Sequence, residues 1–89
     1  MGGKLWDVLE CKWTRQIVGQ LAGGSARFNE IERAMDVPTS TLSDRLKRLE
    51  SAGIVSREVE DDSPPAVRYA LTEKGERLAA LIAEIDALA

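Results

Sequence analysis

The chain has no histidine and only one cysteine among its 89 residues. These counts exclude Ser-His-Asp and Cys-His catalysis, zinc sites that use histidine, and an intramolecular disulfide. No apolar run approaches the roughly 20 residues that span a bilayer, and the first residues lack the apolar core of a signal peptide. We therefore expect a soluble, cytoplasmic protein that is not an enzyme, does not act at a membrane and needs no cofactor or metal.

The chain is also short of positive charge, with 12 Lys and Arg against 15 Asp and Glu. The deficit is uneven along the sequence. Residues 1–38 are balanced at five against five, residues 39–57 carry four basic against two acidic, and residues 58–89 carry three against eight. The only positive segment is therefore residues 39–57, which is where a nucleic-acid partner would bind.

The length favours one domain over residues 1–89 with a modest core, so a second subunit would add stability. Apolar residues recur at helical spacing between Leu5 and Ala22, and Gly23 and Gly24 predict the end of that helix. Its two tryptophans, Trp6 and Trp13, are interpreted as core or dimer packing.

A short extended piece is expected at residues 26–28, followed by a helix that Asn29 caps and that runs to about Met35. Residues 36–38 then form a turn, because proline cannot continue a helix interior.

The next helix is expected from Thr39, with Thr39 or Ser40 as its N-cap, to a stop at residues 52–53. Three leucines form its buried stripe: Leu42, Leu46 and Leu49. Its outer face presents hydroxyls near the start and basic residues further along. Small hydroxyls suit contacts with base edges in a major groove, and lysine and arginine suit phosphates. Any small helical domain contains such a helix, so its neighbours decide the interpretation.

Residues 54–60 and 67–71 favour strands, and the segment between them carries two prolines, so a β-hairpin with an exposed polar tip is predicted. Thr72 is positioned to cap a last helix from about Glu73 to Leu88. That helix carries an apolar stripe surrounded by alanines, which would pack against a second subunit, against the first helix, or against both.

The sequence resembles the HxlR-type winged helix-turn-helix regulators over nearly its whole length. The matching segments are K-W-T at residues 12–14, R-F-N-E-I at residues 27–31, the leucine helix with G-I-V at residues 53–55, and P-P-A-V-R-Y-A-L-T-E-K-G at residues 64–75. The resemblance implies an α+β, mainly α fold: a winged helix-turn-helix with a two-stranded β-hairpin wing and terminal dimerisation helices. It also implies a homodimer that binds double-stranded DNA at an inverted-repeat operator.

The candidate DNA-binding residues combine this resemblance with the positive segment and the hairpin. They are Arg27, Thr39, Ser40, Thr41, Ser43, Asp44, Arg45, Lys47, Arg48, Arg57 and Arg68. Recognition is assigned to the helix of about residues 40–52.

Two features depart from the family pattern. Cys11 stands where relatives commonly have glycine, and it is either a redox sensor beside Lys12 or a small packing residue. Acidic residues at the wing tip, Glu60, Asp61 and Asp62, would repel phosphate. Either the wing does not touch DNA closely, or the protein works at high salt, as in a haloarchaeal source. The alternative function is a protein-interaction module that uses the acidic wing and the last helix.

Overall fold

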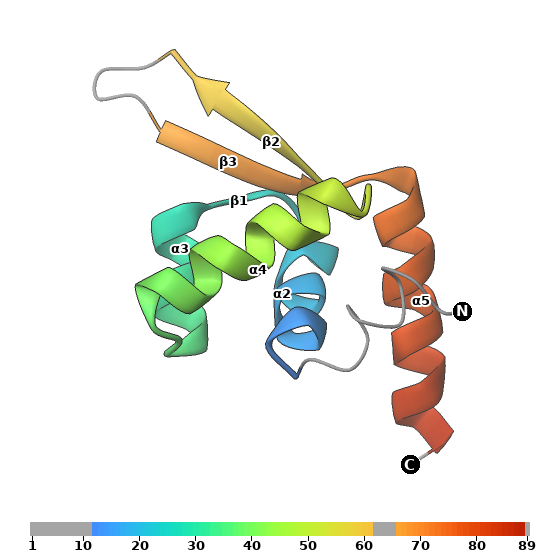
Figure 1. Ribbon diagram of the computed structural model, residues 1–89. Helices are drawn as coiled ribbons and strands as arrows, with labels where there is room; N and C mark the ends of the chain where they lie inside the picture. The colour runs from blue at the N-terminus through green and yellow to red at the C-terminus, as the bar shows by residue number, and fades with distance from the viewer. Residues whose placement is uncertain (1–11, 62–65, 89) are drawn as a thin grey trace.

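The computed structural model describes residues 12–61 and 66–88. In that part of the chain the elements, in order, are α2 (Lys12–Ala22), β1 (Ala26–Arg27), α3 (Phe28–Met35), α4 (Thr39–Ser51), β2 (Val55–Glu60), β3 (Ala66–Leu71) and α5 (Glu73–Leu88). Figure 1 shows α4 crossing the front of the molecule below the β2-β3 hairpin, with α2 behind it and α5 descending at one side. The predicted α+β, mainly α class is confirmed.

Helix α2 ends where the glycine pair predicted. Its last helical residue is Ala22, and Gly24 has a positive φ of 137° that favours glycine. The face formed by Thr14, Ile17, Val18 and Leu21 is buried. Residues 5–11 of the predicted helix, with Trp6 and Cys11, lie outside the described residues, and Trp13 is half-buried.

The predicted caps of α3 and α4 are wrong by one or two residues. Arg27, not Asn29, is the N-cap of α3, because the Glu30 carboxylate accepts the Arg27 backbone N–H at 2.7 Å, which is half of a capping box. Pro38, not Thr39 or Ser40, precedes α4. The Thr39 hydroxyl instead donates to the Glu32 carboxylate and ties α3 to α4 across the turn.

The predicted hairpin is confirmed, but the sheet has three strands rather than two, in the order β1-β3-β2. Strand β1 pairs antiparallel with β3, with Ala26 opposite Tyr69 and Arg27 opposite Arg68. The short extended piece predicted at residues 26–28 is confirmed over Ala26–Arg27, but so short a segment leaves no periodic pattern that would predict its pairing with β3. Its pairing satisfies backbone groups on the outer edge of β3.

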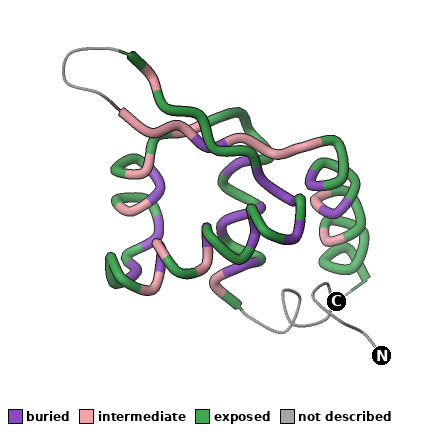
Figure 2. Tube along the Cα trace, turned by 45° about the horizontal axis from the view of Figure 1, so that its top comes forward, coloured by how far each residue is buried: buried purple, intermediate pink, exposed green. Residues whose placement is uncertain are grey.

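The core lies between α4, α2 and the base of the sheet. The stripe of Leu42, Leu46 and Leu49 is confirmed as buried, and Ile17 and Ile54 are fully enclosed with it. Figure 2 shows buried positions on the inner sides of the helices and exposed positions along their outer sides.

Helix α5 has the predicted bounds, and Thr72 caps it by accepting the Gly75 N–H at 3.0 Å. It contributes little to the core. Leu78 is buried, whereas Leu81, Ile85 and Leu88 are 56%, 60% and 88% exposed. The fully buried positions of α5 lie in its first half, Ile82 packs partly against the core, and the other large apolar residues of the second half are exposed.

Candidate nucleic-acid interface

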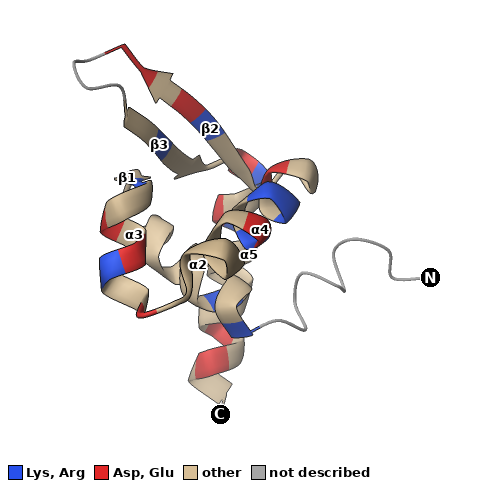
Figure 3. Cartoon of the chain, turned by 60° about the vertical axis from the view of Figure 1, so that its left-hand side comes forward, with Lys and Arg blue, Asp and Glu red and all other residues tan. Residues whose placement is uncertain are grey.

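Helix α4 presents an exposed polar face because its leucine stripe fixes the rotation of the helix against the core. Ser40, Asp44, Lys47, Arg48 and Ser51 are exposed on that face, as predicted. Figure 3 shows basic positions along α4 and on β2. The face combines hydroxyl groups at the start of the helix with cationic groups nearer its end.

Three of the predicted residues lie at the sides of α4 rather than on its outer face. Thr41, Ser43 and Arg45 are half-buried. The Arg45 Nε is enclosed and has no hydrogen-bond partner within the described residues. For Ser43 and Arg45 this agrees with the helical spacing, which places them beside the leucine stripe, whereas for Thr41 the predicted outward orientation is wrong.

Thr39 and Asp44 have partners within the chain. The Thr39 hydroxyl hydrogen is already donated to Glu32, so it is not available to a base edge. Arg48 Nε lies 3.0 Å from Asp44 Oδ2, one helical turn away, and both side chains are more than half exposed. Such an exposed pair is worth about 0–1 kcal/mol, so phosphate can displace the carboxylate at little cost.

Lys47 and Arg57 have no ion-pair partner in residues 12–61 and 66–88. The register places Arg57 opposite Tyr69, and alternation along β2 puts it on the same sheet face as buried Val55. That face is the one the helices cover, so Arg57 lies on the same side of the sheet as α4. Lys47, Arg48 and Arg57 therefore form the positive part of the candidate interface.

Arg27 and Arg68 lie on the opposite face of the sheet, because they pair directly with each other and Arg68 alternates with Tyr69. Both contact the carboxylate of Glu60 at the end of β2, which reaches across β3 to Arg27. Glu60 Oε1 accepts from Arg27 Nε at 3.1 Å and from Arg68 Nε at 3.3 Å, and Arg68 Nη1 donates to Ser25 Oγ at 3.1 Å. The predicted DNA residues thus form two groups rather than one surface.

The net effect of this cluster is to lower the pKa of Glu60 below its ordinary value of 4.5. Desolvation acts in the opposite direction and raises the pKa. The hydrogen bond from Arg27 and the positive charges of Arg68 and Arg27 outweigh it. Glu60 is therefore ionised at neutral pH, and two guanidinium groups lie within 3.3 Å of its carboxylate.

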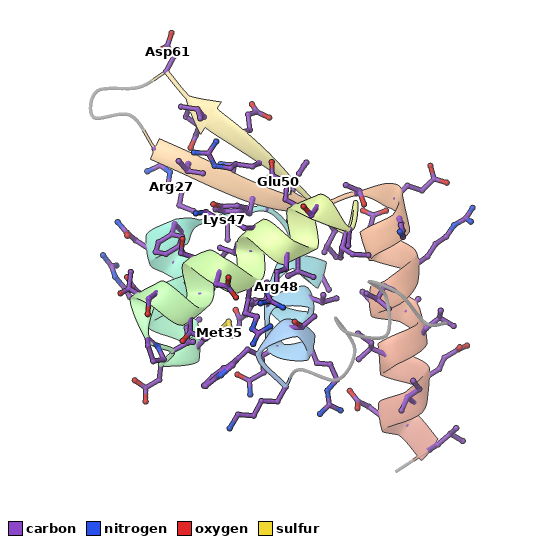
Figure 4. All side chains as sticks on the ribbon, viewed as in Figure 1. Arg27, Met35, Lys47, Arg48, Glu50 and Asp61 are labelled. Carbon is purple, nitrogen blue, oxygen red and sulfur yellow. The ribbon has the colours of Figure 1, made fainter. Side chains whose placement is uncertain are left out.

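The acidic wing tip opposes phosphate less than its sequence suggests. Of the three acids expected to repel phosphate, Glu60 is turned to its arginines, Asp61 is exposed, and Asp62 lies outside the described residues. Figure 4 shows Asp61 projecting from the outer end of the hairpin, away from Lys47 and Arg48 on α4. The acid at Glu60 therefore does not oppose DNA at the base of the wing.

The described residues hold no group of three or more acidic, Cys or His side chains placed to bind a metal ion. In the same part of the chain, every helix is too short or too polar to cross a bilayer.

Three partners of the candidate residues were not anticipated from the sequence: Glu32, Glu60 and Ser25. Glu60 and Ser25 are brought to Arg68 by strand pairing, so no local pattern signals them. For Glu32 a weak signal exists, since it stands one residue before the last turn of α3 and faces the following helix.

The arrangement of three helices, a short first strand and a hairpin is that of winged helix-turn-helix proteins. A MarR-family regulator from Porphyromonas gingivalis W83 superposes with a TM-score of 0.86 at 32% identity, covering 94% of this chain and 83% of that one. The reduced form of the regulator YodB from Bacillus subtilis superposes with a TM-score of 0.85 at 37% identity, covering 93% and 82%.

The sequence identifies the family within that class. The model of the HxlR-like helix-turn-helix matches residues 8–89. The HTH-type transcriptional regulator YvaP of Bacillus subtilis (strain 168) is 44% identical over 84 residues, which is 93% of this chain and 78% of that protein. The chain belongs to the HxlR-like helix-turn-helix family. The predicted resemblance is confirmed, and with it the prediction of a DNA-binding transcriptional regulator.

Proposed function

We propose that this protein regulates transcription in the cytoplasm as a homodimer that binds an inverted repeat in duplex DNA, with α4 of each subunit in a major groove. The observation that carries the proposal is the outward face of α4. Ser40 stands at its start, and Lys47 and Arg48 follow near its end, with Arg57 on the adjoining strand. Hydroxyls at the helix start suit base edges, and the cationic groups suit phosphates on either side of the groove.

The two groups of candidate residues have different parts in this proposal. Lys47, Arg48 and Arg57 supply the main phosphate contacts, because Lys47 and Arg57 have no ion-pair partner among the described residues and Arg48 has only an exposed one. Arg27 and Arg68 are secondary, since Glu60 holds both guanidinium groups against the sheet. They act on flanking phosphate only at the outer side of the wing.

The proposed dimer uses the second half of α5. Leu81, Ile85 and Leu88 recur every three or four residues, so they lie on one side of the helix, and all three are largely exposed. A small monomer rarely leaves such a stripe open to water. Pairing of two α5 helices would cover it and place two α4 helices on one side of the dimer.

Selection of duplexes from a random pool by the wild-type protein tests DNA recognition directly. Affinity for the selected duplex is then measured against salt for Lys47→Gln and Arg48→Gln, with Arg77→Gln on α5 as the charge-matched control. Each α4 variant should flatten the plot of log affinity against log salt by about one unit for every phosphate it no longer neutralises in the DNA site, whereas the control should not. Equal slopes for all proteins would remove α4 from the interface.

A thiol sensor at Cys11 is the remaining sequence prediction. Cys11 lies outside the described residues, and the solved structures of its relative YodB include a reduced form. If Cys11 is a sensor, diamide will change the DNA affinity of the wild type and leave that of Cys11→Ser unchanged. An equal response of both proteins, or none in either, would assign Cys11 to packing.

A further inference from the structure

Side chains outside the candidate interface form hydrogen bonds between the start of α5 and the end of α4. Lys74 Nζ donates to the Ala52 carbonyl oxygen at 2.8 Å. The Thr72 hydroxyl lies 2.5 Å from the Gly53 carbonyl oxygen and 3.1 Å from that of Ile54. The Thr72 backbone N–H donates to the same Ile54 oxygen at 3.0 Å. These five residues are called the α4-α5 joint.

The chemistry of the joint matches what a helix end requires. Ala52 is the C-cap of α4, where backbone carbonyls lack intrahelical partners and the helix carries partial negative charge. An ammonium group supplies both the donor and the opposite charge. The Thr72 hydroxyl also accepts the Gly75 N–H at 3.0 Å, so one side chain serves the end of α4 and the start of α5.

The two segments also approach more closely than any side chain would allow. A Cβ added at Gly75 would lie 2.1 Å from the Ile54 carbonyl oxygen. The first turn of α5 is therefore in direct backbone contact with the residue that links α4 to β2. Rotation of α5 about this point would have to break the bonds of the joint.

Beyond the joint, α5 packs on one side against the rest of the described chain, through Leu78, Ala79 and Ile82, and its last residues, 83–88, are exposed. Within the described residues its buried positions are Gly75 and Leu78, both near its start. A helix of 16 residues is about 24 Å long, so a tilt of about 10° at the joint moves its far end by about 4 Å. This exceeds the rise of roughly 3.4 Å per base pair along the axis of DNA.

We infer that Lys74 and Thr72 are positioning residues that fix the angle between α5 and α4 and thereby set which spacing of two half-sites the dimer accepts. The inference rests on the proposed function, because the spacing has meaning only for a dimer joined through α5. Neither residue needs to touch DNA.

The first measurement uses the inverted repeat selected by the wild-type protein, with its central spacer lengthened or shortened by one base pair. Lys74→Met keeps the aliphatic stem and removes the donor, and Thr72→Val removes the hydroxyl at similar volume. Both variants should lower the ratio of affinities between the selected and altered spacers at least threefold, while affinity for a single half-site changes less than twofold. Arg77→Met, which removes an exposed charge that pairs only with Glu73, and Thr72→Ser should keep the wild-type ratio.

The second measurement needs no DNA. Spin labels at Ser40→Cys and Glu84→Cys, in a Cys11→Ser background and diluted with unlabelled protein, report the distance between the start of α4 and the end of α5 within one chain. The distance distribution should broaden or shift in Lys74→Met and stay as in the wild type in Arg77→Met.

The two measurements distinguish a failure of the positioning role from a failure of the proposed function. A folded Lys74→Met and a folded Thr72→Val that keep both the spacer ratio and the distance distribution would overturn the positioning role. A wild-type protein that selects no duplex would overturn the proposed function and the spacing role with it, while the distance measurement would still show whether the joint holds α5.

Discussion

Replacing Gly75 with alanine tests the backbone contact between α5 and the end of α4. The new Cβ would lie 2.1 Å from the Ile54 oxygen, 3.1 Å from the Ile54 carbonyl carbon and 3.1 Å from Leu71 Cδ2. The nearest atom is backbone in a buried segment, so it cannot swing aside as a flexible side chain would. The start of α5 must therefore move away by about 1 Å, since normal contacts begin near 3 Å.

The expected magnitude follows from three contributions. Forcing an extra methyl group into a packed site costs about 1–3 kcal/mol. Moving Thr72 away from Ile54 weakens at least one hydrogen bond worth about 0.5–1.5 kcal/mol. Alanine in a helix regains about 1 kcal/mol relative to glycine. The net destabilisation is about 2 kcal/mol, which lowers the Tm of a domain of this size by about 8–16 °C.

Gly19→Ala is the matched control, because Gly19 lies within helix α2, is exposed, and has nothing within 4 Å of the place a Cβ would occupy. This variant should be more stable than the wild type by about 0.5–1 kcal/mol. Both are measured by urea and thermal unfolding, followed by circular dichroism at one protein concentration. A Gly75→Ala protein as stable as Gly19→Ala would show that α5 does not contact Ile54 as closely as described.

Three further predictions concern other parts of the molecule. Glu60→Gln should lower the free energy of unfolding near neutral pH, as measured in urea titrations. The pKa of Glu60 is depressed in the folded protein, so its carboxylate stabilises the fold above the ordinary pKa of about 4.5, and this contribution is lost as pH falls through the folded pKa. The difference from the wild type should therefore disappear at pH values below about 4.5, and a difference that is constant with pH would contradict the charge cluster. Ile85→Glu should convert the proposed dimer to monomer in sedimentation experiments without lowering monomer helicity, since Ile85 is 60% exposed, whereas the neighbouring Glu84→Gln should leave the assembly unchanged. A dimer that survives Ile85→Glu would place the interface elsewhere. Thr39→Val should lower the free energy of unfolding by about 0.5–1.5 kcal/mol, because it removes the hydrogen bond to Glu32, and Ser40→Ala should lower it by less. The reverse order of stability in urea unfolding would indicate that Ser40 is the cap of α4.

The helices of this protein follow from local patterns. The leucine spacing of α4, the glycine pair after α2 and the Thr72 cap of α5 each place a boundary within about one residue, because helix ends depend on neighbours three or four residues away. The predicted caps of α3 and α4 are wrong for a related reason. Several residues near each start can serve as caps, and the choice depends on Glu30 and Glu32, whose side chains face back along the chain.

The candidate interface was predictable only in part. Helical spacing placed Lys47 and Arg48 outward and Arg45 beside the leucine stripe, but it could not show that Thr41 is half-buried, since the depth of such a position depends on the neighbouring helices. That Arg27 and Arg68 lie on one face of the sheet and Arg57 on the other follows only from the strand register, because a shift by one residue moves every side chain to the opposite face. The partners Ser25 and Glu60 lie 43 and 8 residues from Arg68, beyond any local pattern.

The register also resolves how a chain with a net charge of −3 presents a positive face. Asp44 on α4 lies 3.0 Å from Arg48 Nε, and Glu60, on the other face of the sheet, lies within 3.3 Å of two arginine nitrogens, whereas Glu50 is an exposed acid of α4. The acids of the last helix, Glu84 and Asp86, stand near the end of a helix about 24 Å long that leads away from α4. Charges are screened over about 8 Å at physiological ionic strength, so those acids do not oppose phosphate bound at α4. Glu58 and Asp61 are exposed acids of the described wing: Glu58 lies on the sheet face opposite that of Arg57, and Asp61 projects from the hairpin's outer end. We therefore expect phosphate that approaches α4 to meet Lys47, Arg48 and Arg57, so that this local charge, and not the net charge of the chain, sets the affinity for DNA.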